Sequence, residues 1–180
     1  MLKELGVPYS LWNGEADETV TKAYKPHTLV KLLAERKATA AYNDIKKDDV
    51  LIVSADTVVA LNGKILGKPK DDDDARQMLR SMSDTKHAVY TGIAVIYQGK
   101  KVSAYEKTDI KFRRLSERDI ERYIGTGEHR DKAGSYGIQE KGGYFVEKVC
   151  GDINNVVGLP VLLLRDLIHK EFSYDIFDPQ

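Results

Sequence analysis

The stretch LIVSADTVVAL, residues 51–61, constrains the fold of this chain more than any other segment. Its valine, isoleucine and leucine residues predict a buried strand. A carboxylic acid, Asp56, lies in the middle of this apolar run. An ionised carboxylate in such surroundings costs several kcal/mol unless it has a partner. We therefore interpret Asp56 as a functional residue, because perturbed acids cluster at functional sites. The alternative is a core acid that backbone N–H groups satisfy.

The composition limits the classes of protein that this chain can belong to. With 180 residues, of which 42% are hydrophobic and 31% charged, it predicts one globular domain with a real core. The formal net charge of +0 gives no support to non-specific nucleic-acid binding. A single cysteine excludes an intrachain disulfide and fits a reducing compartment. No apolar run approaches the roughly 20 residues of a membrane span, and no export signal is visible. We expect a cytoplasmic protein with neither nucleic acid nor membrane as a partner.

Hydrophobic periodicity predicts an alternation of helices and strands. The expected helices are 28–42, 71–82, 116–124 and 160–170, and the expected strands are 51–61, 87–97, 101–112 and 144–149. Asn62-Gly63 is a tight-turn sequence, and the strands 87–97 and 101–112 predict an antiparallel hairpin. This order favours an α/β or α+β fold with a mixed β-sheet flanked by helices.

Several polar residues are candidates for chemistry. Asp56 follows the apolar residues VLIV, and ligands of open α/β sheets gather beyond the carboxyl ends of strands. An acid placed there can activate water or hold a metal ion. Lys68, in the stiff sequence Gly-Lys-Pro, suits a phosphate oxygen as a point charge, although a solvated loop lysine is the simpler interpretation of this motif alone. Lys37 lies on an apolar helix face, where its side chain can reach a pocket or extend to water.

Other polar features have simpler explanations. The acidic run 71–74 fits the start of a helix better than a metal site, because acids there cap the helix and complement its dipole. The four histidines are too scattered for a zinc site, and Cys150 is expected in the core. The glycine-rich segment 126–139 is either a flexible polar loop or a rigid turn that presents Gln139. The amide of Gln139 has one donor side and one acceptor side, which suits the edge of a nucleobase.

Five motifs in their order resemble those of the Maf family of nucleoside triphosphate pyrophosphatases, also called septum formation inhibitors. They are SADTVV (54–59), GKP (67–69), HAVYTG (87–92), DKAGSYGIQ (131–139) and NNVVGLPV (154–161). The resemblance implies an ITPase-like α/β fold, a single domain over residues 1–180 and a homodimer. It also implies hydrolysis between the α and β phosphates, with Mg2+ or Mn2+ as the cofactor. The YGIQ sequence resembles the branch that acts on dTTP and UTP, rather than the branch that acts on 7-methyl-GTP. Modified pyrimidine nucleotides are further possible substrates.

The resemblance also implies roles for individual residues. Asp56 matches the family's proton acceptor, and Thr57 and Gln139 match its positions for base specificity. Lys37, in AERKA, and Lys68, in GKP, match lysines that neutralise phosphate charge.

Metal binding is implied for two acids. Glu18, in ADE, matches an acid of the family's early loop, and this match is weaker than the others. Together with Asp56 it would hold the divalent metal.

One departure from the family pattern concerns the N-terminal region. The family begins with a strand and the motif SPRR, which binds the triphosphate, and this sequence contains no such motif. MLKELG resembles the end of the helix that follows SPRR, although a short frayed turn is the other interpretation. The resemblance implies either a start assigned too late or a lost phosphate-binding loop. The second case leads to an alternative function, a catalytically weak nucleotide-binding regulator of cell division. A purely structural module is a third possibility.

Overall fold

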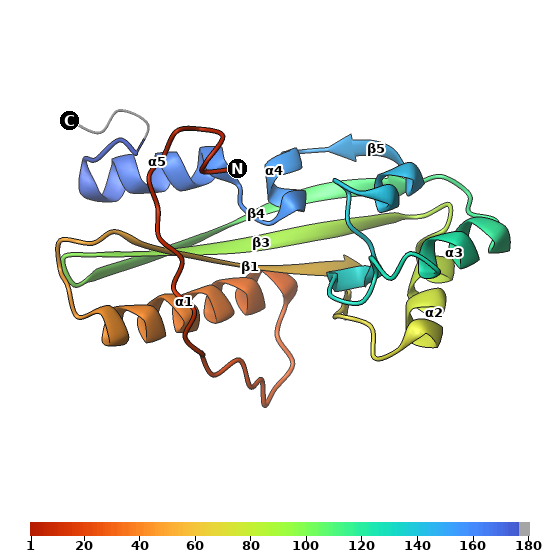
Figure 1. Cartoon of the computed structure of the whole chain (residues 1–180), viewed down its shortest axis with the longest axis horizontal. Coiled ribbons are helices and arrows are strands. Elements are labelled where there is room, and N and C mark those ends of the chain that lie inside the picture. Colours follow the sequence, from red (N-terminus) through yellow and green to blue (C-terminus); the bar gives the residue numbers. More distant parts are fainter. Residues whose placement is uncertain (177–180) are drawn as a thin grey trace. The chain divides into compact units, whose positions relative to one another are not determined.

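A computed structural model describes residues 1–176 and contains a five-stranded sheet with the strand order β2-β1-β3-β4-β5 (Figure 1). The strands are β1 (Ile52–Leu61), β2 (Lys64–Leu66), β3 (Lys86–Tyr97), β4 (Lys100–Phe112) and β5 (Val146–Cys150). β2 pairs antiparallel with β1, and β5 pairs antiparallel with β4. The expected α/β fold, a sheet flanked by helices, is confirmed.

The sheet is antiparallel where the sequence pattern predicted a mixed one. Two tight turns, both expected from the sequence, set the direction of two of the strand pairs. Asn62 and Gly63 join β1 to β2 with φ angles of 50° and 78°. Gln98 and Gly99 join β3 to β4 with φ angles of 50° and 74°. Two residues with positive φ form the turn that closes a hairpin, and a hairpin makes its two strands antiparallel.

Among the described residues, two of the five helices, α2 (Asp72–Met82) and α3 (Glu117–Ile124), begin at the capping residues that the sequence predicted. The others are α1 (Pro26–Ile45), α4 (Ile153–Val157) and α5 (Val161–Phe172), with short 3-10 helices at Ala133–Ser135 and Lys141–Phe145. The Asp71 carboxylate accepts a hydrogen bond from the Asp74 backbone N–H, which confirms that the acidic run caps a helix. Ser116 and Asp119 form the expected capping box of α3. The N-terminal residues 2–6 form a turn and not a helix.

The chain divides into two compact units. The first contains Met1–Asp56, Thr91–Glu106 and the segment from Gly158 onward, and the second contains Thr57–Tyr90 and Lys107–Val157. No helix among the described residues combines the length and the apolar character that crossing a membrane requires.

In the first unit, α1 and α5 cover opposite faces of the sheet (Figure 1). Alternation along the strand explains this arrangement, because Ile52 belongs to the cluster with α1 whereas Val53 belongs to the cluster with α5. The small residue Gly92 on β3 allows α1 to come very close. A Cβ atom added at Gly92 would lie 2.4 Å from the backbone carbonyl of Val30. The helix therefore packs directly on the strand's backbone.

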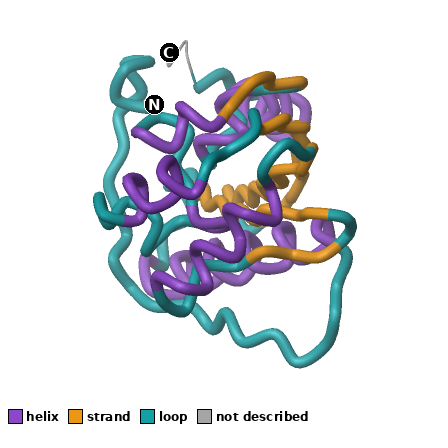
Figure 2. The backbone as a smooth tube through the Cα atoms, turned by 90° about the vertical axis from the view of Figure 1, so that its right-hand side faces the viewer, coloured by secondary structure: helices purple, strands orange, loops and turns teal. Residues whose placement is uncertain are grey.

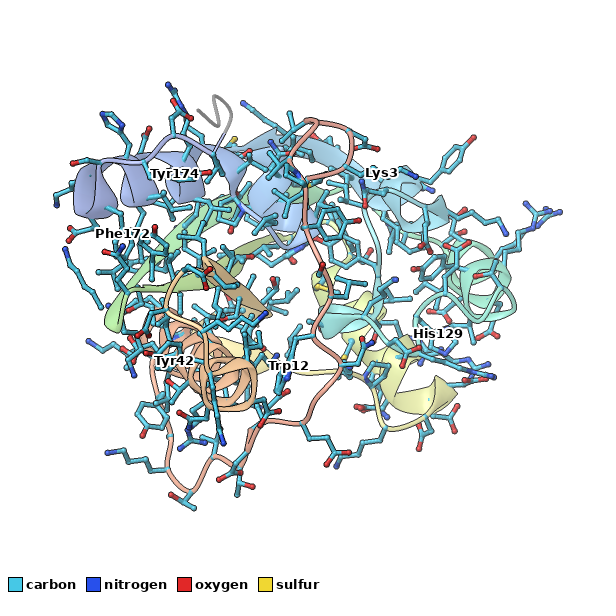
Figure 3. All side chains as sticks on the ribbon, turned by 60° about the vertical axis from the view of Figure 1, so that its left-hand side comes forward. Lys3, Trp12, Tyr42, His129, Phe172 and Tyr174 are labelled. Atoms are coloured by element: carbon cyan, nitrogen blue, oxygen red, sulfur yellow. The ribbon has the colours of Figure 1, made fainter. Side chains whose placement is uncertain are left out.

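The segment between the N-terminal turn and α1, residues 7–25, forms neither helix nor strand (Figure 2). Trp12 from this segment packs against the α1 side of the core (Figure 3). Its indole N–H donates to the Asp44 carboxylate at 3.1 Å. The segment is therefore attached to the first unit by an aromatic anchor as well as by the chain itself.

In the second unit, α2 and α3 enclose an aromatic and aliphatic core that includes Phe112, Tyr123 and Tyr136. Bidentate contacts from Arg76 to Glu121 join the two helices at their surface. Cys150 is exposed at the end of β5, so the expectation that it belongs to the core is wrong.

Candidate active site

The first group of candidate residues lies where β1 faces α1. Ser54 Oγ donates to the carbonyl of Ala34 at 2.5 Å. Two residues further along the strand, Asp56 meets Lys37, which follows Ala34 by one helical turn. Because side chains alternate along a strand, Ser54 and Asp56 share the face that α1 covers. Asp56 therefore lies inside β1, not beyond its carboxyl end as the sequence pattern suggested.

Asp56 and Lys37 form a close ion pair. Lys37 Nζ donates to Asp56 Oδ1 at 2.6 Å, and the two side chains are 28% and 12% exposed respectively. Burial alone would lower the pKa of the Lys37 ammonium, but the hydrogen bond and charge of Asp56, helped by Glu18, outweigh this effect and raise that pKa above its ordinary value. The ammonium stays charged, and it stabilises Asp56 as a carboxylate. The apolar strand thus tolerates its acid because a lysine from the neighbouring helix accompanies it.

Glu18 joins the same lysine from the irregular N-terminal segment. Its Oε1 lies 3.3 Å from Lys37 Nζ, and its side chain is half exposed. Arg36 holds the backbone on both sides of Glu18, because its Nη1 donates to the carbonyls of Asp17 at 3.2 Å and Thr19 at 2.7 Å. The Asp17 carboxylate accepts from the Thr19 backbone N–H at 2.9 Å. Arg36 was not expected from the sequence, since a contact between a helix and an irregular loop leaves no periodic pattern.

Asp56 and Glu18 are the expected metal-binding residues, and both approach one cationic atom, Lys37 Nζ. Among residues 1–176, no group of three or more His, Cys, Asp or Glu side chains could hold a metal ion. Mg2+ commonly takes one or two protein carboxylates and completes its shell with substrate phosphates and water. Asp56 and Glu18 supply carboxylate oxygens of the type that such an ion takes, and the Lys37 ammonium lies against both of them.

The second group of candidate residues belongs to the second unit. Thr57 follows Asp56 in β1 and is half-buried, whereas Lys68 and Gln139 are exposed on loops. The GKP loop is joined to the DKAG sequence, because the carbonyl of Gly67 accepts from the N–H of Gly134 at 3.0 Å. The structure thus gathers Glu18, Lys37 and Asp56 in the first unit, and it places Thr57, Lys68 and Gln139 in the second.

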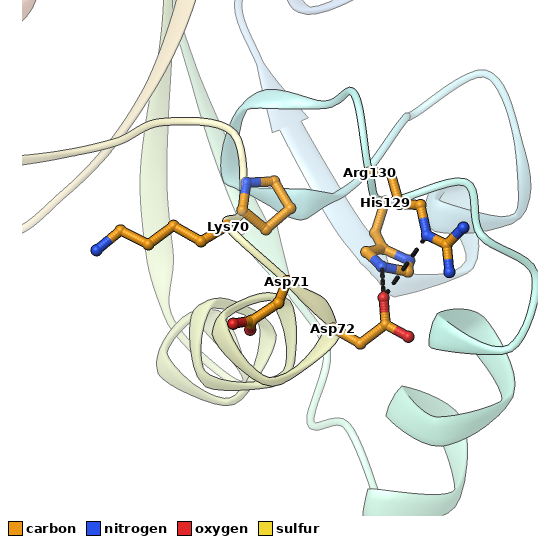
Figure 4. A pocket seen from close by; sticks show the side chains of 6 residues that line it. Lys70, Asp71, Asp72, His129 and Arg130 are labelled. Carbon is orange, nitrogen blue, oxygen red and sulfur yellow. Dashed lines mark hydrogen bonds and ion pairs between the residues drawn. The ribbon is translucent and has the colours of Figure 1, made fainter.

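A pocket that the sequence did not reveal lies beside the GKP loop (Figure 4). It has a volume of about 190 Å³ and is lined by Pro69, Lys70, Asp71, Asp72, His129 and Arg130. The fully buried His129 places Nε2 at 2.9 Å from Asp72 Oδ1, and Arg130 Nε lies 3.6 Å from the same oxygen. The hydrogen bond from His129 and the charge of Arg130 lower the pKa of the Asp72 carboxyl. This pocket therefore contains paired charges that fasten a loop to the start of α2.

Comparisons with known proteins agree with these motifs. The family model described as Maf-like protein matches residues 1–171. The chain is similar to the dTTP/UTP pyrophosphatase of Pelotomaculum thermopropionicum, with 42% identity over 178 residues, which cover 98% of this chain and 92% of that protein. It is also similar to the dTTP/UTP pyrophosphatase of Bacillus cereus strain B4264, with 41% identity over 177 residues, which cover 98% and 91% of the two chains.

Proposed function

Because this chain belongs to the Maf family, we propose that it is a nucleoside triphosphate pyrophosphatase that hydrolyses dTTP and UTP. The observation that carries this proposal is the identity of 42% to a dTTP/UTP pyrophosphatase across 98% of the chain. The reaction breaks the bond between the α phosphorus and the oxygen that bridges to the β phosphorus. Water supplies the new oxygen on the monophosphate, and pyrophosphate leaves.

Asp56 is the proposed proton acceptor. The attacking water must lose a proton, and a carboxylate can take it only while it is ionised. The Lys37 ammonium, 2.6 Å away, favours the ionised form. The polar pair lies against an otherwise apolar helix–strand interface, so it is partly shielded from bulk water.

Lys37 and Lys68 are proposed to neutralise charge on the triphosphate. An ammonium group serves this role as a point charge and needs no particular orientation. Thr57 and Gln139 are proposed to select the base. The amide of Gln139 can donate to O4 of thymine or uracil and accept from the N3–H beside it.

Asp56 and Glu18 are proposed to hold a divalent metal, Mg2+ or Mn2+, together with substrate oxygens. When bound, such an ion supplies Lewis-acid polarisation of the phosphates. The homodimer that the family resemblance implied and the cytoplasmic location expected from the composition stay predictions. Sedimentation at several protein concentrations checks the first of them.

The test is pyrophosphate release from a panel of nucleoside triphosphates with Mg2+ or Mn2+. We expect release from dTTP and UTP well above release from dATP, dGTP and dCTP. Calorimetry with dTTP completes the experiment. Binding of dTTP without turnover would contradict the proposal and support the alternative, a nucleotide-binding regulator of cell division. If the protein neither binds nor hydrolyses dTTP, both functions are contradicted.

A further inference from the structure

Gln139 lies on a well-defined turn in the second unit. The Glu140 backbone N–H donates to the Gly137 carbonyl at 3.4 Å, so Ile138 and Gln139 are the two central residues. Ile138 packs against the core of this unit, whereas Gln139 is exposed. The turn is therefore anchored to the core through Ile138 and presents the Gln139 amide to the outside.

The first anchor is Tyr123 on α3. Its phenol oxygen accepts a hydrogen bond from the Gly137 backbone N–H at 3.2 Å. Tyr123 is only 3% exposed, and its ring packs edge-on against Phe145 with centroids 4.9 Å apart. Burial raises the pKa of this phenol to about 12, so it is neutral under ordinary conditions. A rigid buried ring thus fixes the first residue of the turn.

The second anchor is Tyr136, the residue just before the turn. Its hydroxyl lies 2.8 Å from His87 Nε2, and both side chains are buried. The ring of Tyr136 also packs edge-on against Phe112, with centroids 4.7 Å apart. His87 belongs to HAVYTG and Tyr136 to YGIQ, so this contact joins two motifs that are 49 residues apart.

The backbone segment that follows the turn packs closely against it. A Cβ atom added at Gly142 would lie 2.7 Å from the Gly137 carbonyl oxygen, and one added at Gly143 would lie 2.5 Å from the Ile138 carbonyl oxygen. Such distances are too short for any side chain. Glycine at both positions therefore lets the two backbone segments touch, and the turn has little room to shift.

We propose that Tyr123 and Tyr136 are specificity-positioning residues, which hold the turn so that Gln139 meets the edge of the pyrimidine base in one orientation. This inference rests on the proposed function and deepens it. Two hydroxyl contacts and two close backbone approaches restrain this turn, so the geometry favours a rigid turn over a flexible polar loop. Discrimination between bases requires donors and acceptors at fixed positions, because a mobile amide adapts to the wrong base as readily as to the right one.

The test replaces each tyrosine by phenylalanine, which removes the hydroxyl and keeps the buried ring. For Tyr123→Phe and Tyr136→Phe we expect the ratio of kcat/KM for dTTP to kcat/KM for dCTP to fall about fivefold, which corresponds to about one hydrogen bond. The change should lie in KM, while kcat for dTTP stays within about twofold. Gln139→Ala gives the full loss of selectivity for comparison.

Ile120→Val is the matched control, because Ile120 is a buried member of the same core and its side chain has no hydrogen-bonding group that could hold the turn. It should lower the melting temperature and leave the selectivity ratio unchanged. Amide hydrogen exchange of residues 137–140 provides a second measurement, and both tyrosine variants should exchange faster there.

Three results would overturn the inference. The first is an unchanged selectivity ratio in variants whose turn exchanges faster, which would make the anchors merely structural. The second is a loss of selectivity in Ile120→Val as large as in the tyrosine variants. The third is normal selectivity in Gln139→Ala. Failure of the proposed function is distinct, because it would show as absence of pyrophosphate release from dTTP and UTP by the unmodified protein.

Discussion

Lys37 on α1 and Asp56 on β1 form an ion pair with 2.6 Å between Nζ and Oδ1. A neighbouring hydrogen bond holds the strand and the helix together beside this pair. Ser54 Oγ fastens the same stretch of strand to the carbonyl of Ala34, one helical turn before Lys37. The strand and the helix are therefore held together beside the two charges, and the Asp56 carboxylate is fixed next to the Lys37 ammonium.

Asp56→Asn should lower pyrophosphate release from dTTP by at least about 100-fold, because an amide cannot accept the proton of the attacking water. The amide has nearly the same shape, so circular dichroism should show an unchanged fold. Asp166→Asn, on the exposed side of α5, is the control and should keep full activity. Full activity in Asp56→Asn would exclude this residue as the base.

Lys37→Met should destabilise the protein, because it removes the ammonium that accompanies the largely buried Asp56 carboxylate. The double variant with Asp56→Asn should recover part of the lost free energy of unfolding, since the unpaired carboxylate charge is also removed. A double-mutant cycle on the free energy of unfolding should give a coupling of about 1–3 kcal/mol. Strict additivity of the two changes would show that the pair contributes nothing to stability.

His87 should make stability depend on pH. Burial lowers the pKa of this imidazole to about 4, although the charge of Asp109 partly opposes the shift. The folded state thus binds the proton less readily than the unfolded state, whose histidine titrates near its ordinary value of about 6.5. The contribution of His87 is complete above pH 6.5 and is lost as the pH falls toward 4, by about 3 kcal/mol in all. Below pH 4 this histidine adds no further change.

Urea unfolding of the wild type and of His87→Gln between pH 4 and pH 8 checks this expectation. The difference between the two proteins should shrink as the pH falls through this window. A difference that stays constant with pH would mean that His87 titrates normally despite its burial.

Gly92→Ala should be strongly destabilising. The new Cβ would lie 2.4 Å from backbone atoms of Val30 and 2.6 Å from the backbone nitrogen of Lys31, so α1 would have to move off β3. Overpacking of this kind costs about 1–3 kcal/mol or more. Gly67→Ala is the matched control, since its Cβ would meet no atom within 4 Å, and it should change stability by less than about 0.5 kcal/mol. Equal melting temperatures for the two variants would contradict the close packing.

Local patterns in the sequence were enough to predict most of the helices and strands. The capping residues of α2 and α3 and the turn at Asn62-Gly63 are encoded within a few neighbouring positions. The mixed sheet was predicted wrongly, although the turn at Asn62-Gly63 and the hairpin of β3 and β4 were expected. No local signal fixes the direction of β5, which follows β4 after a long connection and pairs antiparallel with it.

The supporting contacts of the candidate site could not be predicted. Tyr123 and Gly137 are 14 positions apart, Arg36 and Thr19 are 17 apart, and His87 and Tyr136 are 49 apart. No short motif indicates such partners, since only folding brings these residues together. The proposed roles of Asp56, Lys37 and Gln139 rest on the resemblance to a family, and the structure adds the contacts around each of them.

Arg36→Ala should weaken divalent metal binding without changing the residues that would hold the metal. Arg36 binds the carbonyls of Asp17 and Thr19, so its loss frees the backbone on both sides of Glu18. Loss of a residue that supports a ligand typically lowers metal affinity about 10- to 100-fold. We therefore expect the Mn2+ concentration for half-maximal activity to rise at least about tenfold, and Mn2+ titration by electron paramagnetic resonance should give the same shift. Arg36→Lys should lie between, since an ammonium can donate to both carbonyls but lacks the rigid planar guanidinium that fixes the position of Nη1.

Arg165→Ala is the control for this change, because Arg165 is an exposed arginine of α5 in the same unit. It should leave both titrations unaltered. If Arg36→Ala lowers the melting temperature but keeps the wild-type Mn2+ affinity, Arg36 does not position Glu18 for a metal, and the arginine serves only to fasten the N-terminal segment to α1.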